Sequence, residues 1–138
     1  MTSNDSPSGG NAPRARPSIV YVDDDSDLLK LVELCFKIFG GTEIATYSDG
    51  EKFQQMFEKG AYGILLFDWQ MPRLTGIDLA DWVRNVQGDS DATVILVTAR
   101  NVDEESEMIK RLHISGVIPK PFDPHDFATM ALALHRKG

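Results

Sequence analysis

The segment ILLFD, residues 64–68, is a run of four apolar residues that ends in an acid. An uninterrupted apolar run is typical of a strand that is buried on both faces of a parallel sheet. Similar runs end at polar side chains elsewhere: 19–22 before Asp23 and Asp24, 93–97 before Thr98, and 117–119 before Lys120. The carboxyl ends of parallel strands meet at one edge of a sheet, where ligands bind. We therefore expect these polar residues to share a pocket with Asp68.

Strands and helices alternate along the rest of the chain, with strands expected at 19–22, 42–46, 64–67, 93–97 and 117–118. Helices are expected at 26–39, 49–59, 77–86 and 102–112, and from 123 to about 136. Five strand–helix units of this kind predict an α/β fold with a doubly wound parallel sheet. Residues 1–17 are rich in breakers and are expected to be a disordered tail before a single domain at 18–138.

Several residues at helix ends have the types that begin or stop helices. Asp25 is expected to cap the first helix, and Gly40 with Gly41 to end it. Ser48 and Glu51 have the spacing of a capping box. Asp123 followed by Pro124 predicts the start of the last helix. Cys35 lies on the apolar stripe of the first helix, where it is expected to be a small buried hydrophobe.

Composition excludes several classes of protein. The 138 residues carry 14 basic and 21 acidic side chains, a net charge of −7, which argues against direct binding of nucleic acid. No apolar run approaches the roughly 20 residues needed to cross a membrane, and no signal peptide is recognisable. One cysteine excludes an internal disulfide framework. We expect a cytoplasmic protein without membrane insertion.

The strand-end acids predict a site for Mg²⁺, which prefers oxygen ligands. Asp24 and Asp68 offer carboxylates, Gln70 a main-chain carbonyl, and Asp23 a third carboxylate that would hold a metal-bound water. Asp68 is also a competent nucleophile toward phosphorus. The Lys120 ammonium and the Thr98 hydroxyl suit the oxygens of a phosphoryl group.

With these residues the chain resembles the receiver domain of two-component response regulators, and chemotaxis-type single-domain regulators in particular. The resemblance runs from Ile19 to about Arg136, and its motifs are IVYVDDD, LLFDWQMPRLTG, VILVTAR and VIPKPF. It implies a flavodoxin-like sheet in the order 2-1-3-4-5 with five helices. It also implies Mg²⁺-dependent phosphorylation of Asp68 by a histidine kinase or histidine phosphotransfer protein, with Thr98 and Lys120 assisting and Gly76 in the following turn. The chain would catalyse only its own phosphorylation and dephosphorylation, and would not be an enzyme toward a separate substrate.

One position departs from the pattern of that family. Valine stands at 117, where the resemblance predicts an aromatic side chain that rotates inward on activation. Without this rotor, the expected output surface is still formed by Val102–Leu112, Val117–Ile118 and Asp123–Arg136, and it binds a downstream protein. The chain stops shortly after the last helix, which slightly favours a single-domain regulator over an excised receiver.

Three other functions are alternatives to that of a phosphoacceptor. An aspartate-nucleophile phosphatase would need a second acid where Gln70 stands. A flavin or nucleotide module would need a phosphate-binding loop after the first strand, where this chain places acids. A degenerate receiver that serves only for docking would not need the acids, the threonine and the lysine.

Overall fold

The computed structural model describes residues 18–137, except the side chains of 124, 125, 136 and 137. The tail predicted for residues 1–17 lies outside the described residues. The described strands are β1 (Ile19–Val22), β2 (Ala45–Tyr47), β3 (Ile64–Asp68), β4 (Thr93–Thr98) and β5 (Ile114–Pro119). The helices are α1 (Ser26–Cys35), α2 (Gly50–Met56), α3 (Gly76–Asp81), α4 (Glu107–Arg111) and α5 (Pro124–Lys137). Helices α1 and α3 continue as π-helical turns over Phe36–Gly40 and Trp82–Val86.

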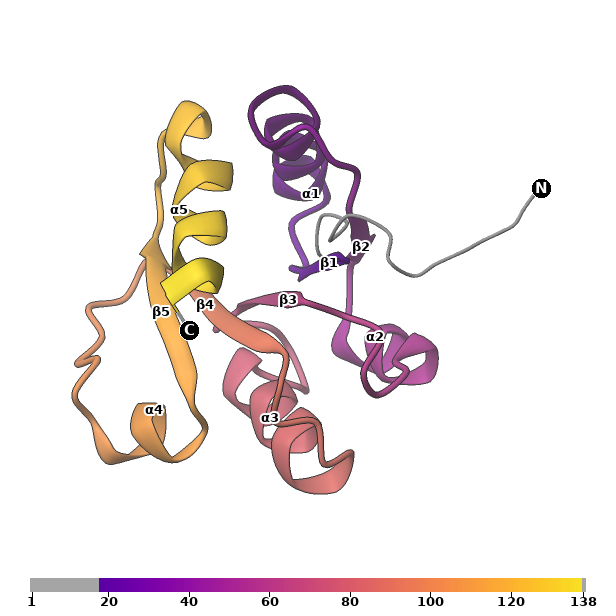
Figure 1. Cartoon of the computed structure of the whole chain (residues 1–138), viewed down its shortest axis with the longest axis vertical. Helices are drawn as coiled ribbons and strands as arrows, with labels where there is room; N and C mark the ends of the chain where they lie inside the picture. Colours follow the sequence, from indigo (N-terminus) through magenta and orange to yellow (C-terminus); the bar gives the residue numbers. More distant parts are fainter. Residues whose placement is uncertain (1–17, 138) are drawn as a thin grey trace.

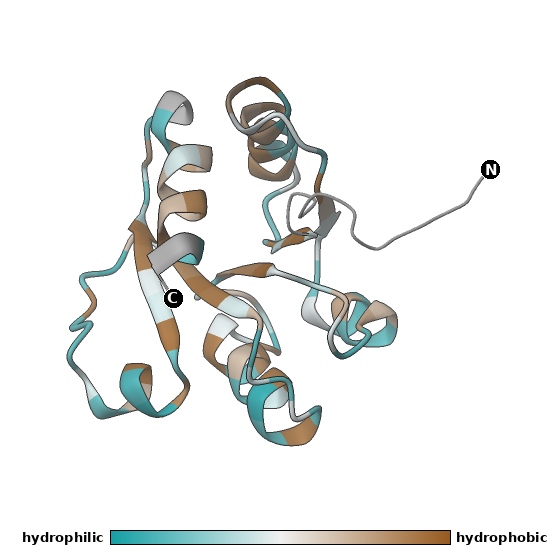
Figure 2. Ribbon diagram, in the orientation of Figure 1, coloured by the Kyte–Doolittle hydropathy of each residue, from teal (hydrophilic) through white to brown (hydrophobic). Residues whose placement is uncertain are grey.

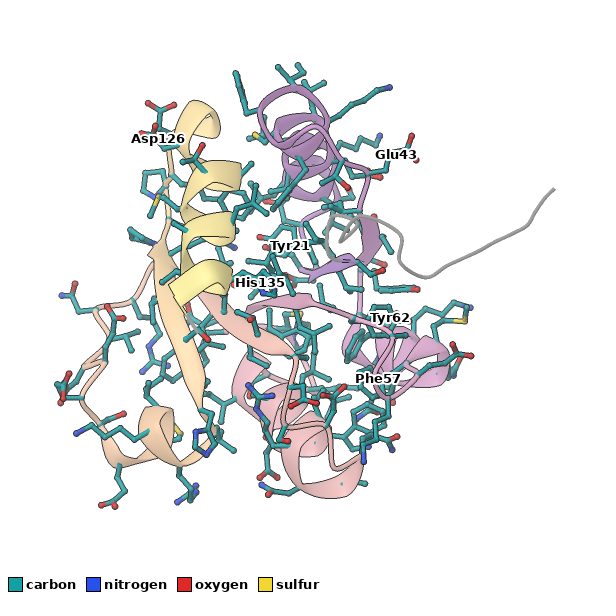
Figure 3. The ribbon with its side chains drawn as sticks, in the orientation of Figure 1. Tyr21, Glu43, Phe57, Tyr62, Asp126 and His135 are labelled. Atoms are coloured by element: carbon teal, nitrogen blue, oxygen red, sulfur yellow. The ribbon has the colours of Figure 1, made fainter. Side chains whose placement is uncertain are left out.

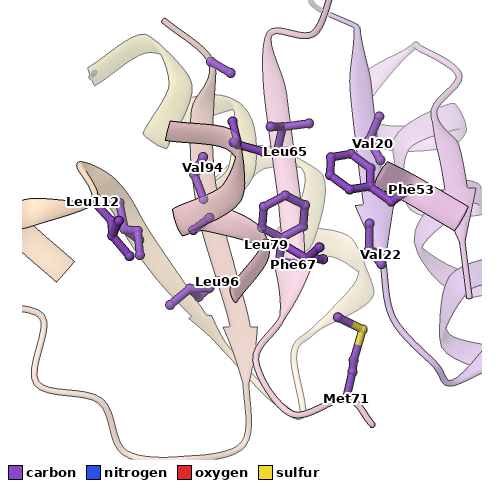
Figure 4. Packing of buried hydrophobic residues seen from close by; sticks show 14 of the residues in the cluster. Val20, Val22, Phe53, Leu65, Phe67, Met71, Leu79, Val94, Leu96 and Leu112 are labelled. Atoms are coloured by element: carbon purple, nitrogen blue, oxygen red, sulfur yellow. The ribbon is translucent and has the colours of Figure 1, made fainter. Parts of the chain in front are cut away.

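The sheet is parallel throughout, in the order β2-β1-β3-β4-β5, which confirms the predicted fold (Figure 1). Strand β1 shows how alternation fills both faces. Val20 and Val22 belong to a buried cluster that includes residues of α2, α3 and α4, whereas Ile19 and Tyr21 belong to a second cluster that includes residues of α1 and α5. Figure 4 shows the first of these layers, with Phe53 among the labelled side chains around the strands. Burial on both faces explains why β3 is apolar up to the acid at its end, Asp68 (Figure 2).

The first helix begins as predicted, and its end displaces the next strand. The Asp25 carboxylate accepts hydrogen bonds from the N–H groups of Asp27 and Leu28, at 3.1 Å each. Gly41 has a left-handed φ of 64°, and the N–H of Thr42 donates to the carbonyl of Phe36 at 3.1 Å. Because the main chain of Thr42 closes this helix end, the strand predicted at 42–46 is wrong in its bounds, and β2 begins only at Ala45. Cys35 is buried, as predicted.

The capping box predicted for the second helix is wrong. Asp49, and not Ser48, is the N-cap, and its carboxylate accepts the N–H of Lys52 at 2.7 Å. Glu51 turns away from the helix end and pairs with Arg73 at 2.8 Å. Aspartate caps a helix as well as serine does, and it adds a negative charge near the positive end of the helix dipole.

The predicted end of this helix at residue 59 is also wrong, because α2 stops at Met56. Phe57 takes an extended conformation with ψ of 137°. Its ring packs against Phe53 and Trp82, with centroid distances of 5.6 and 5.4 Å. Burial of this aromatic ring therefore outweighs one more turn of helix.

The helix predicted at 102–112 is much shorter than expected, since α4 covers only Glu107–Arg111. Asp103 prevents an earlier start. Its side chain accepts the N–H of Glu105 at 2.9 Å, and its carbonyl accepts the N–H of Ser106 at 3.0 Å. Such local turns satisfy the same backbone groups that a helix would use. The segment after β4 is therefore a loop.

Strand β5 is longer than the predicted strand at 117–118 and extends over Ile114–Pro119. No apolar run marks its first half, which contains Ser115 and Gly116. Gly116 lies so close to α5 that a Cβ atom would stand 2.7 Å from the side chain of Leu134. Pairing with β4 therefore defines this strand more than its own composition does.

Asp89 organises the loop between α3 and β4. Its carboxylate is 2% exposed and accepts the N–H groups of Gly60, Asp91 and Ala92 at 3.0, 3.1 and 3.1 Å. Burial acts to raise the pKa of Asp89, but these N–H groups and the charge of Arg84 outweigh it and hold the pKa below its usual value. The ionised carboxylate therefore stabilises the folded state.

We expect Asp89→Ala to lower the free energy of unfolding at pH 7 by about 2–3 kcal/mol, because the variant leaves N–H groups without their charged acceptor. Because the folded-state pKa is lowered, the ionised carboxylate stabilises the protein at pH values above 3.8, the ordinary pKa of aspartate. This stabilisation is lost as the pH falls through the folded-state pKa. Denaturant titrations at pH 7 and pH 3 should show the difference from wild type shrinking in acid. Asp91→Ala, which removes an exposed carboxyl next to this loop, is the control; a deficit that grows in acid would contradict the assignment.

No helix in the described part of the chain combines the length and the hydropathy needed to cross a membrane.

Candidate functional site

Three acids lie together at the carboxyl edge of the sheet. Val22 of β1 stands in register with Phe67 of β3, so the residues that follow them, Asp23 and Asp68, emerge side by side. A carboxylate oxygen of Asp23, one of Asp24 and one of Asp68 lie within 4.8 Å of one another. Asp23 and Asp68 are buried, at 0% and 5% exposure, whereas Asp24 is exposed. Carboxylates at this separation repel one another and favour a cation between them.

Lys120 lies between two of these acids. Its Nζ atom donates to Asp23 Oδ2 at 2.9 Å and to Asp68 Oδ1 at 3.2 Å. Its main-chain N–H donates to the carbonyl of Thr98 at 2.8 Å, which fixes the end of β5 against β4, and the bond to Pro121 is cis. Burial opposes the charge of Lys120, but the two carboxylates outweigh burial and raise its pKa. The side chain is therefore a permanent cation at the centre of the site.

The environment of the Asp68 carboxylate disfavours its negative charge. Burial, followed by the charge of Asp23, raises the pKa of Asp68 from 3.8 to about 6, although Lys120 and a hydrogen bond from the Gln70 main chain act against the rise. The carboxylate is thus mostly ionised at neutral pH, and it is more basic than an exposed aspartate. Both properties suit a nucleophile.

Thr98 reaches the same edge, as predicted. Asp68 pairs with Val97 in the sheet, so the last residue of β4 lies next to the end of β3. Thr98 is 1% exposed, and its hydroxyl accepts the N–H of Arg100 at 3.1 Å. The guanidinium of Arg100 lies over the ring of Trp69, 5.4 Å from its centroid. This stacking joins the loop after β4 to the loop after β3.

The loop that follows Asp68 turns sharply at Gly76. The Gly76 N–H donates to the carbonyl of Trp69 at 3.0 Å. A Cβ atom on Gly76 would stand 2.6 Å from the main-chain oxygen of Asp68 and 3.0 Å from the Cα of Trp69. Only glycine allows this close approach of two backbone segments.

Sequence reasoning missed Tyr21, which it counted only as an apolar strand residue. Its hydroxyl donates to Asp23 Oδ2 at 2.5 Å within the buried interior. Burial, and then the charge of Asp23, raises the pKa of Tyr21 above its usual value. The sequence contains a signal for this contact, because Tyr21 and Asp23 are two residues apart and such residues lie on the same face of a strand.

The three carboxylates fit a divalent cation of the size of Mg²⁺, since they supply hard oxygen ligands in a partly open cluster. The predicted carbonyl ligand from Gln70 stays a prediction. We expect Asp24→Ala to weaken Mg²⁺ binding by about tenfold or more, since a ligand should matter at least as much as its supporting residues. Quenching of Trp69 fluorescence, next to the site, is a suitable measure.

Asp27→Ala is the matched control, because Asp27 is an exposed acid of the same segment outside the cluster. Its Mg²⁺ affinity should equal that of wild type. Equal affinities for wild type and Asp24→Ala would contradict the ligand assignment.

Most of the described domain is similar to known proteins. The family model of the response regulator receiver domain matches residues 19–132. The chain is 31% identical over 104 residues to the chemotaxis protein CheY of Pseudomonas aeruginosa, covering 75% of this chain and 84% of that protein. It is 29% identical over 121 residues to the transcriptional regulatory protein CpxR homolog of Haemophilus influenzae, covering 87% of this chain but 51% of that protein.

Solved structures show the same fold. The chemotaxis response regulator CheY4 of Vibrio cholerae superposes with a TM-score of 0.76 at 21% identity, covering 87% of this chain and 99% of that one. The beryllofluoride-activated DrrB receiver domain gives a TM-score of 0.72 at 22% identity over 88% of this chain and 99% of that one.

Proposed function

We propose a function for this chain from its family: it belongs to the response regulator receiver domain family. It is a phosphoacceptor in which Asp68 receives a phosphoryl group from a partner protein. The observation that carries the proposal is the position of Asp68 at the end of a central strand, with an acid cluster on one side and the Lys120 ammonium 3.2 Å away. The donor is a histidine kinase or a histidine phosphotransfer protein. The cytoplasmic location predicted from the sequence stays a prediction.

In the proposed step, a carboxylate oxygen of Asp68 attacks the phosphorus of a phosphohistidine. The new O–P bond forms as the P–N bond breaks, and the electron pair stays on the departing imidazole. The Lys120 ammonium, already shared by Asp23 and Asp68, pairs with an oxygen of the transferred group. The Thr98 hydroxyl can donate to another. Bound Mg²⁺ would supply positive charge that balances the carboxylates and the phosphoryl oxygens.

The test uses a small phosphodonor, so that no partner needs to be known. Wild-type protein incubated with acetyl phosphate and Mg²⁺ should gain a single phosphoryl group, measured by intact-protein mass spectrometry. The same mixture with EDTA should gain none. Failure of the wild-type protein to gain a group at saturating donor and Mg²⁺ would overturn the proposal.

We also propose that the chain is not an enzyme toward a separate substrate. Gln70 stands two residues after Asp68, and its amide cannot act as a general acid for a leaving group. A chromogenic phosphate ester should therefore not be turned over beyond the single phosphorylation of the protein. Sustained turnover would favour a phosphatase.

Arg100 and Gln70 should set the lifetime of the phosphoryl group. The Arg100 side chain lies on Trp69, beside Asp68, and is exposed, so it can move over the site or away from it. We expect the double variant Gln70→Ala/Arg100→Ala to change the rate of dephosphorylation several-fold, followed by mass spectrometry after removal of the donor. Arg111→Ala, on α4, is the control and should behave as wild type.

The proposed output surface runs from Val102 to Leu112 and from Asp123 to Arg136, together with β5. Residue 117 is a valine, which has no aromatic ring to rotate, and it packs, partly buried, against the core. We propose that the loop between Thr98 and α4 carries the signal instead, because its turn at Asp103 leaves it without helical structure. A downstream protein that binds this surface is the proposed target.

A further inference from the structure

The Tyr21 hydroxyl is a polar group in an apolar surrounding. Its residue is fully buried, and Figure 3 shows it in the interior of the molecule, between α1 and α5. The ring lies 6.0 Å from that of Phe127, which packs edge-on against Phe36 at 5.9 Å. A phenylalanine would fill this layer equally well. Burial of a hydroxyl in such a layer costs free energy unless the group is hydrogen-bonded.

The partner of this hydroxyl is a residue of the phosphorylation site. Tyr21 donates to Asp23 Oδ2 at 2.5 Å, and Lys120 donates to the same oxygen at 2.9 Å. The other oxygen, Oδ1, accepts the N–H of Asp25 at 2.9 Å. The carboxylate of Asp23 is therefore fixed in position by a strand, a helix start and a lysine.

We infer that Tyr21 is a positioning residue that sets the orientation of the Asp23 carboxylate for metal binding and phosphoryl transfer. This inference rests on the proposed function of the site. Three facts combine: the hydroxyl points at the site, its ring is held by the layer between α1 and α5, and the carboxylate that it holds also shares Lys120 with Asp68. Without the hydroxyl, Asp23 gains freedom to rotate.

The freed carboxylate also changes the balance at Lys120. An acceptor that loses one of its two donors at Oδ2 holds the remaining donor more strongly. Lys120 should then lie closer to Asp23 and pair less with Asp68 or with an incoming phosphoryl group. Both effects weaken the site, and neither requires a change in the fold.

The test is Tyr21→Phe, which removes one oxygen atom and keeps the ring. We expect its Mg²⁺ affinity, read from Trp69 fluorescence, to fall by about tenfold, as is usual when a group that orients a ligand is removed. The rate of phosphorylation by acetyl phosphate at saturating Mg²⁺ should fall as well. Tyr62→Phe is the matched control, because its hydroxyl donates to the carbonyl of Met56, away from the site, at 3.0 Å. The control should match wild type in both measurements.

A double-mutant cycle separates positioning from a general structural role. If Tyr21 acts through Asp23, the substitution Tyr21→Phe should change Mg²⁺ affinity in the wild-type background and leave it unchanged in the Asp23→Asn background. Equal losses in both backgrounds, or no loss in the first, would overturn the inference, as would a wild-type protein that binds no Mg²⁺. The cycle is read on Mg²⁺ affinity alone. A protein that binds Mg²⁺ but is not phosphorylated would refute the proposed function and the role of Tyr21 in phosphoryl transfer, and would leave its role in metal binding standing.

Discussion

Asp68→Asn should remove all labelling by acetyl phosphate and, in the absence of Mg²⁺, should make the protein more stable than wild type. The first effect follows because an amide is not a nucleophile toward phosphorus. The second follows because the folded state disfavours the Asp68 charge: its carboxylate is buried beside Asp23 and Asp24, and its pKa is raised to about 6. At 1.36 kcal/mol for each pKa unit, the expected gain at pH 7 is roughly 1–3 kcal/mol, and this gain already contains the opposing effect of Lys120.

The stability gain has a sign that can be checked against pH and metal. A raised folded-state pKa means that wild type loses stability relative to the variant as the pH rises through the range between 3.8 and about 6. Denaturant titrations in EDTA should therefore show the two proteins converging at pH 4 and differing at pH 7. Mg²⁺ should stabilise wild type and have little effect on the variant. A variant that is less stable than wild type in EDTA at pH 7 would show that the pair with Lys120 outweighs the repulsion.

Gly76→Ala should cause a large loss of stability and should damage the metal site with it. The added Cβ would stand 2.6 Å from the Asp68 main-chain oxygen, and neither backbone segment is free to move without disturbing β3. Overpacking against a backbone costs roughly 3 kcal/mol. The shift falls directly on Asp68 and Trp69, so we expect Mg²⁺ affinity to fall together with the free energy of unfolding.

Gly116→Ala is the comparison that isolates the cause. Its Cβ would also be too close to a neighbour, at 2.7 Å, but that neighbour is the end of the flexible Leu134 side chain. A side chain can rotate away, so the loss of stability should be smaller and Mg²⁺ affinity should stay at the wild-type value. If the two alanine variants behave alike, contact with the backbone is not what makes Gly76 special.

The parts of the site that sequence reasoning found have a common physical origin. Strands buried on both faces must be apolar along their length, so Ile64–Asp68 and Thr93–Thr98 were visible as runs, and the polar residues at their ends were visible as exceptions. Parallel pairing then requires those ends to meet. Asp25 as a helix cap and Gly41 as a helix stop were equally predictable, because each interaction stays within a few residues.

The missed features involve competition between local and distant partners. Residues 102–112 have enough apolar periodicity for a helix, but the turn at Asp103 satisfies the same backbone groups, and only the folded chain shows which arrangement is adopted. The first half of β5 has no apolar signal, because β4 supplies the hydrogen bonds that make it a strand. Helix α2 ends before Phe57 because the Phe57 ring contacts Phe53 and Trp82, and only Phe53 is near it in sequence.

The sequence by itself therefore determined the alternation of strands and helices and which side chains stand at the ends of the strands, since both depend on periodicity and burial along one segment. The tertiary structure decided how those side chains are connected. Lys120 donates to both Asp23 and Asp68, Arg100 lies over Trp69, and Asp89 accepts the N–H of Gly60. Each of these contacts joins residues that lie 29 to 97 positions apart in the chain. Such contacts are selected by the packing of the whole sheet with its helices, which no single stretch of sequence contains.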